Sequence, residues 1–345
     1  MTAGRGAVIA LALLLALALP AHAEDAAAGI GLGLFATDPN FNYGALIEEI
    51  EEAGAEHVLL VVPWYQKNVR STVIRPLPGR SPSIETVRRT LNQLKTAGIG
   101  ATVMPIVLLE VQEHARQWRG VITPERHGVD GTARWFASYR DFVVAHAVLA
   151  GEVEAERFIV GSELLSMEDR RELWLELIHR VRAVFNGPLV YSANWDQFDE
   201  VSFWDALDGI GVNGYFRLAP DGVRPGEDAL VDAWARPLAD LAELRDKVGL
   251  PLLITEVGYS SRSTAAAKPW CACAAEPIDQ ELQATLYRAL FRVFADRELE
   301  RRGEAPLPFD QYFVWNWFGF GGPEDGTFTP RGKPAERVLR DALSR

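Results

Sequence analysis

The chain has 345 residues, of which 48% are hydrophobic and 24% are charged, a composition typical of a globular protein and not of a disordered one. It has 47 Asp and Glu residues against 35 Lys and Arg, and no run of basic residues interrupts it. Nucleic acids and anionic lipid surfaces are therefore poor candidate partners.

The first segment has the features of a cleavable secretory signal peptide. Arg5 precedes an apolar run at residues 7–19, and Pro20 and the small-residue site Ala21-His22-Ala23 follow it. The run is shorter than the roughly 20 apolar residues that a membrane-spanning helix needs. We expect residues 1–23 to be removed after Ala23, and the mature protein, residues 24–345, to be secreted or periplasmic without a membrane span.

From about residue 29, helical patterns alternate with short apolar runs. In the first unit, a helical pattern over residues 46–53 ends at Gly54 and is followed by an apolar run at 57–63. Later units repeat this order, with apolar runs at 100–108 and 250–256. Apolar strands without polar alternation are typical of a parallel sheet that helices cover on its buried faces.

Eight such strands can be assigned along the chain. They are predicted near residues 29–35, 57–63, 100–108, 157–162, 188–193, 208–213, 250–256 and 310–317. Eight strand–helix units in a chain of this length predict an α/β fold, a single-domain (β/α)₈ TIM barrel. The alternative is an open, doubly wound sheet, which usually has a Gly-rich turn after its first strand, whereas Gly29, Gly31 and Gly33 lie inside the predicted strand.

The longest irregular stretches all follow the carboxyl ends of predicted strands. They lie near residues 109–133, 217–235, 259–280 and 318–333. Barrel enzymes build their active sites at this end of the barrel. We therefore expect the functional site there.

Two apolar strands end in a glutamate without an adjacent basic residue, at Glu163 and Glu256. Hydrolysis of a glycosidic bond needs one carboxylic acid to protonate the leaving oxygen and one carboxylate to meet the oxocarbenium charge. Because the fourth and seventh strands face each other across a barrel, we expect a retaining glycoside hydrolase with Glu163 as acid/base and Glu256 as nucleophile. The charge of an ionised Glu256 is expected to favour the protonated form of Glu163. The alternative is that Glu163 caps the next helix or pairs with an arginine.

Aromatic and amide side chains gather at the same predicted strand ends. Sugar rings pack their C–H faces on aromatic rings, and their hydroxyl groups need polar partners. A tryptophan taken alone is more often a core residue than a substrate platform, and only the clustering at one barrel face shifts that balance. Glu110 fits a solvated loop start better than a substrate contact. The predicted substrate-binding residues are Trp64, Asn194, Trp195, Asn213, Tyr215, Trp270, Trp315 and Trp317.

The two cysteines, Cys271 and Cys273, are separated by one residue. In an oxidising compartment this spacing allows a small disulfide within a loop. A metal site is disfavoured because no histidine or further cysteine lies nearby to complete a set of four ligands, and the histidines lack the spacing of metal-binding motifs. We expect neither a metal nor a cofactor.

Several segments together resemble glycoside hydrolase family 113. They are Val160-Gly161-Ser162-Glu163-Leu164, residues 254–259, Gly332-Lys333-Pro334-Ala335, Trp135-Phe136 with Tyr139, and Pro269-Trp270, and the resemblance extends over roughly residues 30 to 340. It implies a retaining barrel that acts on β-1,4-mannan, with the acid/base at Glu163, the nucleophile at Glu256 and a hydrogen bond from Tyr215 to the nucleophile. Ser162 departs from the wider clan, which mostly has Asn before the acid/base.

Two other functions compete with this interpretation. A barrel that binds glycan without cleaving it, associated with polysaccharide processing or export, would keep the aromatic residues but has little reason to keep both glutamates. A metal-dependent barrel hydrolase would need a ligand set that the sequence does not offer in the usual spacing. The expected partner is therefore a polysaccharide or oligosaccharide substrate, bound by a monomer.

Overall fold

The computed structural model describes residues 26–114, 116–124, 131–295, 303 and 305–344. The predicted signal peptide at residues 1–23 lies outside these ranges. In the described part of the chain, no helix combines the length and the apolar character needed to span a membrane.

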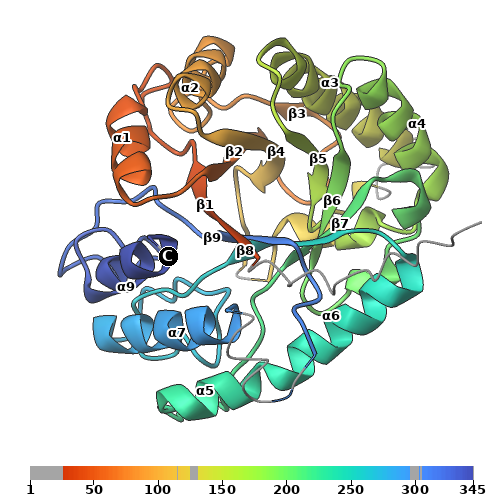
Figure 1. Cartoon of the computed structure of the whole chain (residues 1–345). Coiled ribbons are helices and arrows are strands. Elements are labelled where there is room, and N and C mark those ends of the chain that lie inside the picture. Colours follow the sequence, from red (N-terminus) through yellow and green to blue (C-terminus); the bar gives the residue numbers. More distant parts are fainter. Residues whose placement is uncertain (1–25, 115, 125–130, 296–302, 304, 345) are drawn as a thin grey trace, which may run out of the picture.

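Within the described residues, eight parallel strands close into a barrel (Figure 1). β1 pairs with both β2 and β9, so the sheet has no free edge between its first and last parallel strands. The short β3 (Ile74–Arg75) adds antiparallel pairing at the end of β2. The barrel strands are β1 (Ala27–Gly33), β2 (His57–Gln66), β4 (Gly100–Leu109), β5 (Arg157–Ser162), β6 (Leu189–Asn194), β7 (Gly209–Asn213), β8 (Leu252–Val257) and β9 (Gln311–Val314). The predicted single-domain barrel is confirmed, each strand lies within a few residues of its predicted place, and the open sheet is excluded.

Helices surround the barrel between successive strands (Figure 1). Local signals set several of their ends: the side chains of Ser83 and Asp279 accept hydrogen bonds from the first turns of α2 and α7, and Gly249 ends α6 with a left-handed φ of 75°. The helices are α1 (Gly44–Glu52), α2 (Ile84–Thr96), α3 (Gly131–Glu152), α4 (Arg171–Arg182), α5 (Glu227–Ala233), α6 (Ala235–Val248), α7 (Gln280–Val293) and α9 (Pro334–Leu343), with short 3₁₀ turns at Arg119–Val121, Leu165–Met167, Phe198–Glu200 and Trp204–Ala206.

The core has two layers, which explains why the strands lack polar alternation. One set of strand side chains packs outward against the helices, and a smaller set, which includes Leu59, Met104 and Phe313, fills the inside of the barrel. The glycines of β1 make room for this interior packing. A Cβ atom on Gly29 would lie 2.5 Å from the Phe313 ring.

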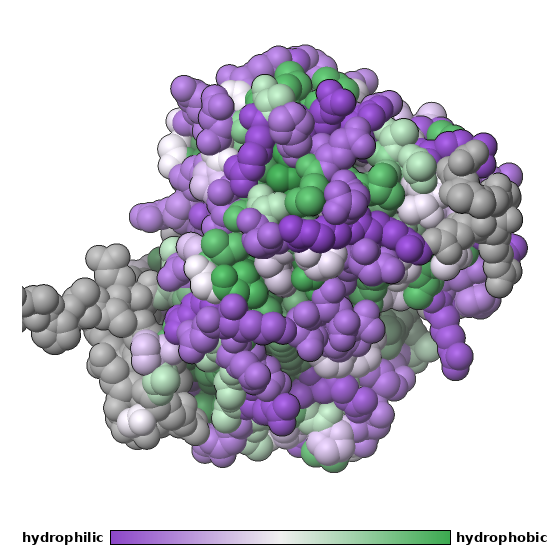
Figure 2. All heavy atoms as spheres, turned by 90° about the vertical axis from the view of Figure 1, so that its right-hand side faces the viewer, coloured by the Kyte–Doolittle hydropathy of each residue, from purple (hydrophilic) through white to green (hydrophobic). Residues whose placement is uncertain are grey.

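The face of the molecule shown in Figure 2 is mostly hydrophilic, with hydrophobic residues gathered in patches between the hydrophilic ones. The long loops that the sequence predicts connect the carboxyl ends of strands to the next helices. The cavity described next opens at those strand ends.

Candidate active site

A cavity of about 630 Å³ opens at the carboxyl end of the barrel strands. Seven of the predicted site residues line it: Glu163, Asn194, Trp195, Tyr215, Glu256, Trp270 and Trp315. The other lining residues were not predicted from the sequence, and they are Phe35, Ile106, Leu108, Arg116, Trp118, Arg119, Asp196 and Phe328. The structure therefore brings both predicted glutamates to one cavity.

The backbone at Glu163 adopts a left-handed conformation with a φ of 52°, which is uncommon for a residue with a side chain. Hydrogen bonds on both sides of this turn hold it. The Glu163 amide donates to the Ser192 carbonyl at 2.8 Å, and the Leu164 amide donates to the Tyr191 hydroxyl at 2.9 Å. The same hydroxyl donates to the buried carboxyl of Glu168 at 2.7 Å. This network fixes the direction in which the Glu163 side chain leaves the strand.

The Glu163 carboxylate has two strong partners. Nη2 of Arg119 lies 2.5 Å from one of its oxygens, and Nδ2 of Asn213 donates to the other at 2.9 Å. The Arg119 Nε also donates to the Ser162 carbonyl at 3.2 Å. Glu163 thus has an arginine partner, as the alternative expected, and this contact lies in the lining of the cavity. Both partners are hydrogen-bond donors, and Arg119 also carries a positive charge.

Glu256 is buried at the end of β8, where the Tyr215 hydroxyl donates to its Oε2 at 2.6 Å. Burial, and then the negative charge of Glu163, raises the pKa of the Glu256 carboxyl to about 7. The positive charge of Arg119 and the hydrogen bonds from Tyr215 and Asn213 act in the opposite direction. The surroundings of the two glutamates therefore favour a proton on Glu256.

Asn213 connects the two glutamates from below the cavity. Its Oδ1 accepts hydrogen bonds from the hydroxyls of Ser192 at 2.8 Å and Thr255 at 2.9 Å, which orients its Nδ2 toward Glu163. Its amide also contributes a hydrogen bond that lowers the pKa of Glu256. The fully buried Asn213 amide thus interacts with both carboxyl groups. The ends of β5 and β8 therefore lie close together on either side of it.

Arg119 is the most important site residue that was not predicted from the sequence. It lies on a 3₁₀ turn in the long loop after β4, and its guanidinium is largely buried between Glu163 and the charge of Glu256. The position of this loop at the carboxyl end of a strand was the available signal. No local pattern separates Arg119 from the other arginines of the chain, because its role depends on contacts with β5 and β8.

Aromatic rings form one side of the cavity. Trp195, after β6, stacks on Trp270, in the loop after β8, with ring centroids 5.4 Å apart and planes at 12°. Trp270 remains 44% exposed, so its ring is accessible at the cavity mouth. Trp315 packs edge-on against Phe35 at 6.1 Å. Asn194, which also lines the cavity, donates to Asp196.

Two of the predicted substrate-binding tryptophans lie away from the cavity. Trp64 stacks on Phe142 of α3 at 4.8 Å, and Trp317 is fully buried and donates from Nε1 to Glu49 of α1 at 2.9 Å. The physical reason for Trp64 is the alternation of side chains along a strand. Its neighbours at two-residue spacing, such as Val62, pack outward with the helices, so Trp64 faces the helix layer and not the barrel mouth.

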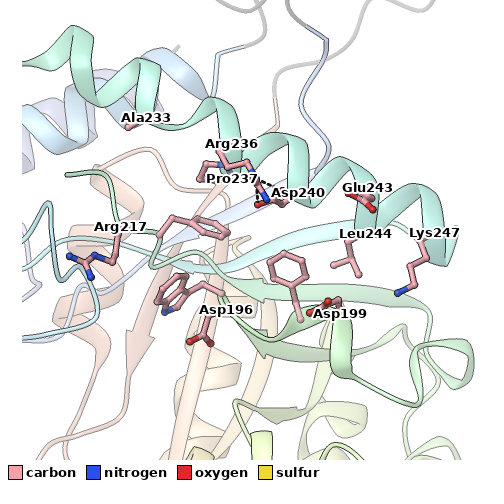
Figure 3. Close-up of a pocket in the computed structure, with 13 residues that line it drawn as sticks. Asp196, Asp199, Arg217, Ala233, Arg236, Pro237, Asp240, Glu243, Leu244 and Lys247 are labelled. Atoms are coloured by element: carbon pink, nitrogen blue, oxygen red, sulfur yellow. Dashed lines mark hydrogen bonds and ion pairs between the residues drawn. The ribbon is translucent and has the colours of Figure 1, made fainter. Parts of the chain in front are cut away.

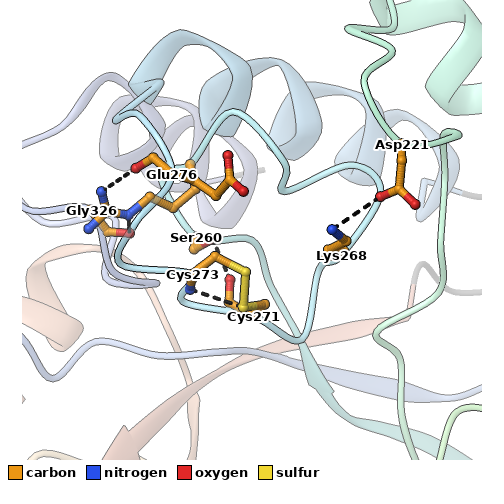
Figure 4. Close-up of a disulfide and its surroundings, with 8 residues drawn as sticks. Asp221, Ser260, Lys268, Cys271, Cys273, Glu276 and Gly326 are labelled. Carbon is orange, nitrogen blue, oxygen red and sulfur yellow. Dashed lines mark hydrogen bonds and ion pairs between the residues drawn. A yellow bond between two sulfur atoms is a disulfide. The ribbon is translucent and has the colours of Figure 1, made fainter. Parts of the chain in front are cut away.

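Cys271 and Cys273 form a disulfide directly after Trp270, as the sequence allowed (Figure 4). The Ser260 hydroxyl donates to the Cys271 carbonyl at 2.8 Å. An ion pair between Lys268 and Asp221 at 3.4 Å attaches the same loop to the loop after β7 (Figure 4). The segment that carries Trp270 is therefore held to its neighbours from both sides.

Comparisons with known proteins agree with this geometry. A family model described as Glycoside Hydrolase Family 113 matches residues 41–318. A family 113 β-mannanase from Alicyclobacillus acidocaldarius, solved in complex with ManMIm, is 26% identical with a TM-score of 0.77, and the alignment covers 92% of this chain and 96% of that chain. A second family 113 β-1,4-mannanase structure, a complex, is 23% identical with a TM-score of 0.77, over 92% of this chain and 98% of that chain.

A more distant structure, an endo-β-1,4-mannanase from Thermotoga petrophila, shares the fold at 10% identity and a TM-score of 0.53, over 93% of this chain and 77% of that chain. No curated protein sequence matches this one. The family match covers most of the chain, and the solved family 113 structures share its fold. The chain belongs to glycoside hydrolase family 113.

Proposed function

We propose that this glycoside hydrolase cleaves β-1,4-mannan or manno-oligosaccharides with retention of configuration, through Glu163 as acid/base and Glu256 as nucleophile. The observation that carries the proposal is a pair of buried carboxyl groups that share the Asn213 amide within one aromatic-lined cavity. The choice of sugar rests on the likeness to the family 113 β-mannanase from Alicyclobacillus acidocaldarius.

The proposed reaction has two displacements. In the first, the Glu256 carboxylate attacks the anomeric carbon, the glycosidic C–O bond breaks, and Glu163 gives its proton to the leaving oxygen. The glycosyl ester at Glu256 carries no charge, so the repulsion between the two carboxyl groups ends. Glu163, now ionised, takes a proton from water as the water oxygen attacks the anomeric carbon, and the bond between that carbon and the Glu256 oxygen breaks, which releases the sugar.

Arg119 imposes a condition on this mechanism. Its guanidinium lies 2.5 Å from the Glu163 carboxylate, so it occupies the group that must reach the glycosidic oxygen. We propose that a sugar bound in the cavity separates this ion pair and that the proton on Glu256 is passed to Glu163 before the attack. Tyr215 then remains as the hydrogen-bond donor that orients the ionised Glu256.

The test is hydrolysis by the purified mature protein of β-mannan, glucomannan, β-glucans, xylan and β-1,3-linked polymers, with reducing ends measured. We expect β-mannan to be cleaved fastest, and NMR of the first product to show the β-anomer. Inversion would contradict the double displacement. Binding of glycan without cleavage of any polymer would favour the non-catalytic barrel, and activity abolished by a chelator would favour the metal-dependent hydrolase.

The pH dependence of activity provides a separate prediction. Because the proton that Glu163 donates comes from Glu256, whose pKa is about 7, kcat/KM should fall as the pH rises above about 7, where this proton is lost. Arg119 lowers this pKa, so Arg119→Met should raise it and move the alkaline-side fall to higher pH. A rise of one pKa unit increases the protonated fraction above the pKa by about tenfold.

The matched control is Arg119→Lys, which keeps the positive charge and should restore most of the wild-type pH profile. The measurement is kcat/KM between pH 4 and 9 on a soluble oligosaccharide. An unchanged alkaline-side limb in Arg119→Met would show that the charge of Arg119 does not act on the nucleophile.

A further inference from the structure

A second hollow of about 560 Å³ adjoins the catalytic cavity. The two spaces share Trp195 and Asp196 in their linings, so they meet at the loop after β6. The hollow runs under α6, with Asp196 and Asp199 on one side and Glu243 and Lys247 of the helix on the other (Figure 3). We call it the α6 groove.

The floor of the α6 groove is apolar and partly aromatic. Phe216, Pro237 and Leu244 are buried beneath it, and Phe198 is half-buried on its wall. Trp195 packs edge-on against Phe216 at 6.3 Å while its ring stacks on Trp270 at the cavity mouth. A continuous set of rings therefore leads from the catalytic cavity into the groove.

The rim carries charges of both signs in nearly equal number. Arg236 and Asp240 pair with each other at 2.7 Å. The remaining lining charges are Asp196, Asp199 and Glu243 against Arg217 and Lys247. Such a rim offers hydrogen-bond donors and acceptors without a strong field of one sign, which suits an uncharged ligand rich in hydroxyl groups better than an anionic one.

We infer that the α6 groove binds further sugar residues of the same uncharged β-linked chain whose scissile bond lies between Glu163 and Glu256. This inference rests on the proposed function and extends it to the length of substrate that the enzyme contacts. Apolar sugar faces pack on Phe198 and the ring of Trp195, and the rim side chains hydrogen-bond the hydroxyl groups. Long chains then bind more tightly than short ones through contacts that lie outside the catalytic cavity.

The test compares wild type and Phe198→Ala on manno-oligosaccharides of increasing length. Loss of one aromatic contact should raise KM about two- to tenfold for the longest chains. The KM for the shortest cleavable oligosaccharide should equal the wild-type value. The matched control is Val184→Ala, an exposed apolar residue after α4 that does not line the groove. Equal changes at every chain length, or none, would overturn the inference.

A second pair of variants tests the α6 groove independently, in case Phe198→Ala does not fold. Lys247→Ala removes an exposed groove side chain, whereas Arg245→Ala removes a neighbouring side chain of α6 that does not line the groove. Only Lys247→Ala should raise KM selectively for long chains. Equal effects of the two variants on KM would contradict sugar binding in the α6 groove.

A binding measurement distinguishes failure of the α6 groove inference from failure of the proposed function. If wild type cleaves no β-mannan, calorimetric titration with mannohexaose and cellohexaose still reports on the α6 groove. Tighter binding of either hexasaccharide than of its disaccharide, weakened in Phe198→Ala, supports a sugar-binding groove. Equal affinities in wild type and Phe198→Ala overturn it.

Discussion

Glu256→Ala is expected to reduce hydrolysis of β-mannan by on the order of 10⁴-fold or more, because it removes the group that attacks the anomeric carbon. The fold should survive, since a buried carboxyl whose pKa is raised to about 7 contributes no favourable charge in its ionised form. The measurement is kcat/KM on mannan and on an activated aryl mannoside, with circular dichroism to check folding. Added azide should restore turnover of the aryl mannoside by occupying the space of the lost carboxylate.

The control for Glu256→Ala is Glu110→Ala. Glu110 follows β4 at the same end of the barrel but does not line the cavity, and it pairs with Arg75 at 3.0 Å in an exposed setting. Removal of this surface ion pair should leave kcat/KM near the wild-type value. Wild-type turnover by Glu256→Ala on any active substrate would refute the assignment of the nucleophile.

Glu163→Gln is expected to slow the cleavage of mannan by about 10²- to 10⁴-fold, the usual contribution of a general acid. The loss should be much smaller in the first step for aryl mannosides with good leaving groups, because these need little protonation. With such substrates the glycosyl ester should accumulate, since the substituted amide cannot take a proton from water, and a burst of released phenol should precede slow turnover.

The dependence on the leaving group separates a catalytic role from a structural one. A substitution that only disturbed the Arg119 ion pair or the turn after β5 would slow all substrates to a similar degree. Equal losses on mannan and on aryl mannosides, without a burst, would therefore contradict the role of Glu163 as acid/base. Thermal unfolding of Glu163→Gln provides the check on folding.

The pattern of residues along the chain was enough to predict the barrel and the two glutamates. Eight apolar runs separated by helical patterns have few alternatives to a closed parallel barrel, because strands buried on both faces need helices on the outside and side chains within. Once the strands are assigned, the residue at each carboxyl end is known to within a few positions. From that rule we predicted that Glu163 and Glu256 lie at the same end of the barrel. The structure places both in the lining of one cavity. The signal peptide, outside the described residues, stays a prediction.

The neighbours that act on these groups could be identified only from contacts in three dimensions. Trp64 satisfies the strand-end rule but packs against α3, because a single step along a strand reverses the direction of a side chain. Trp317 lies beyond the end of β9, where the chain has left the strand, and is buried against α1. Arg119 comes from an irregular loop, and its contact with Glu163 joins elements far apart in the chain. The raised pKa of Glu256 follows from burial and from the nearby charge of Glu163, which depend on distance in space and not on spacing in the sequence.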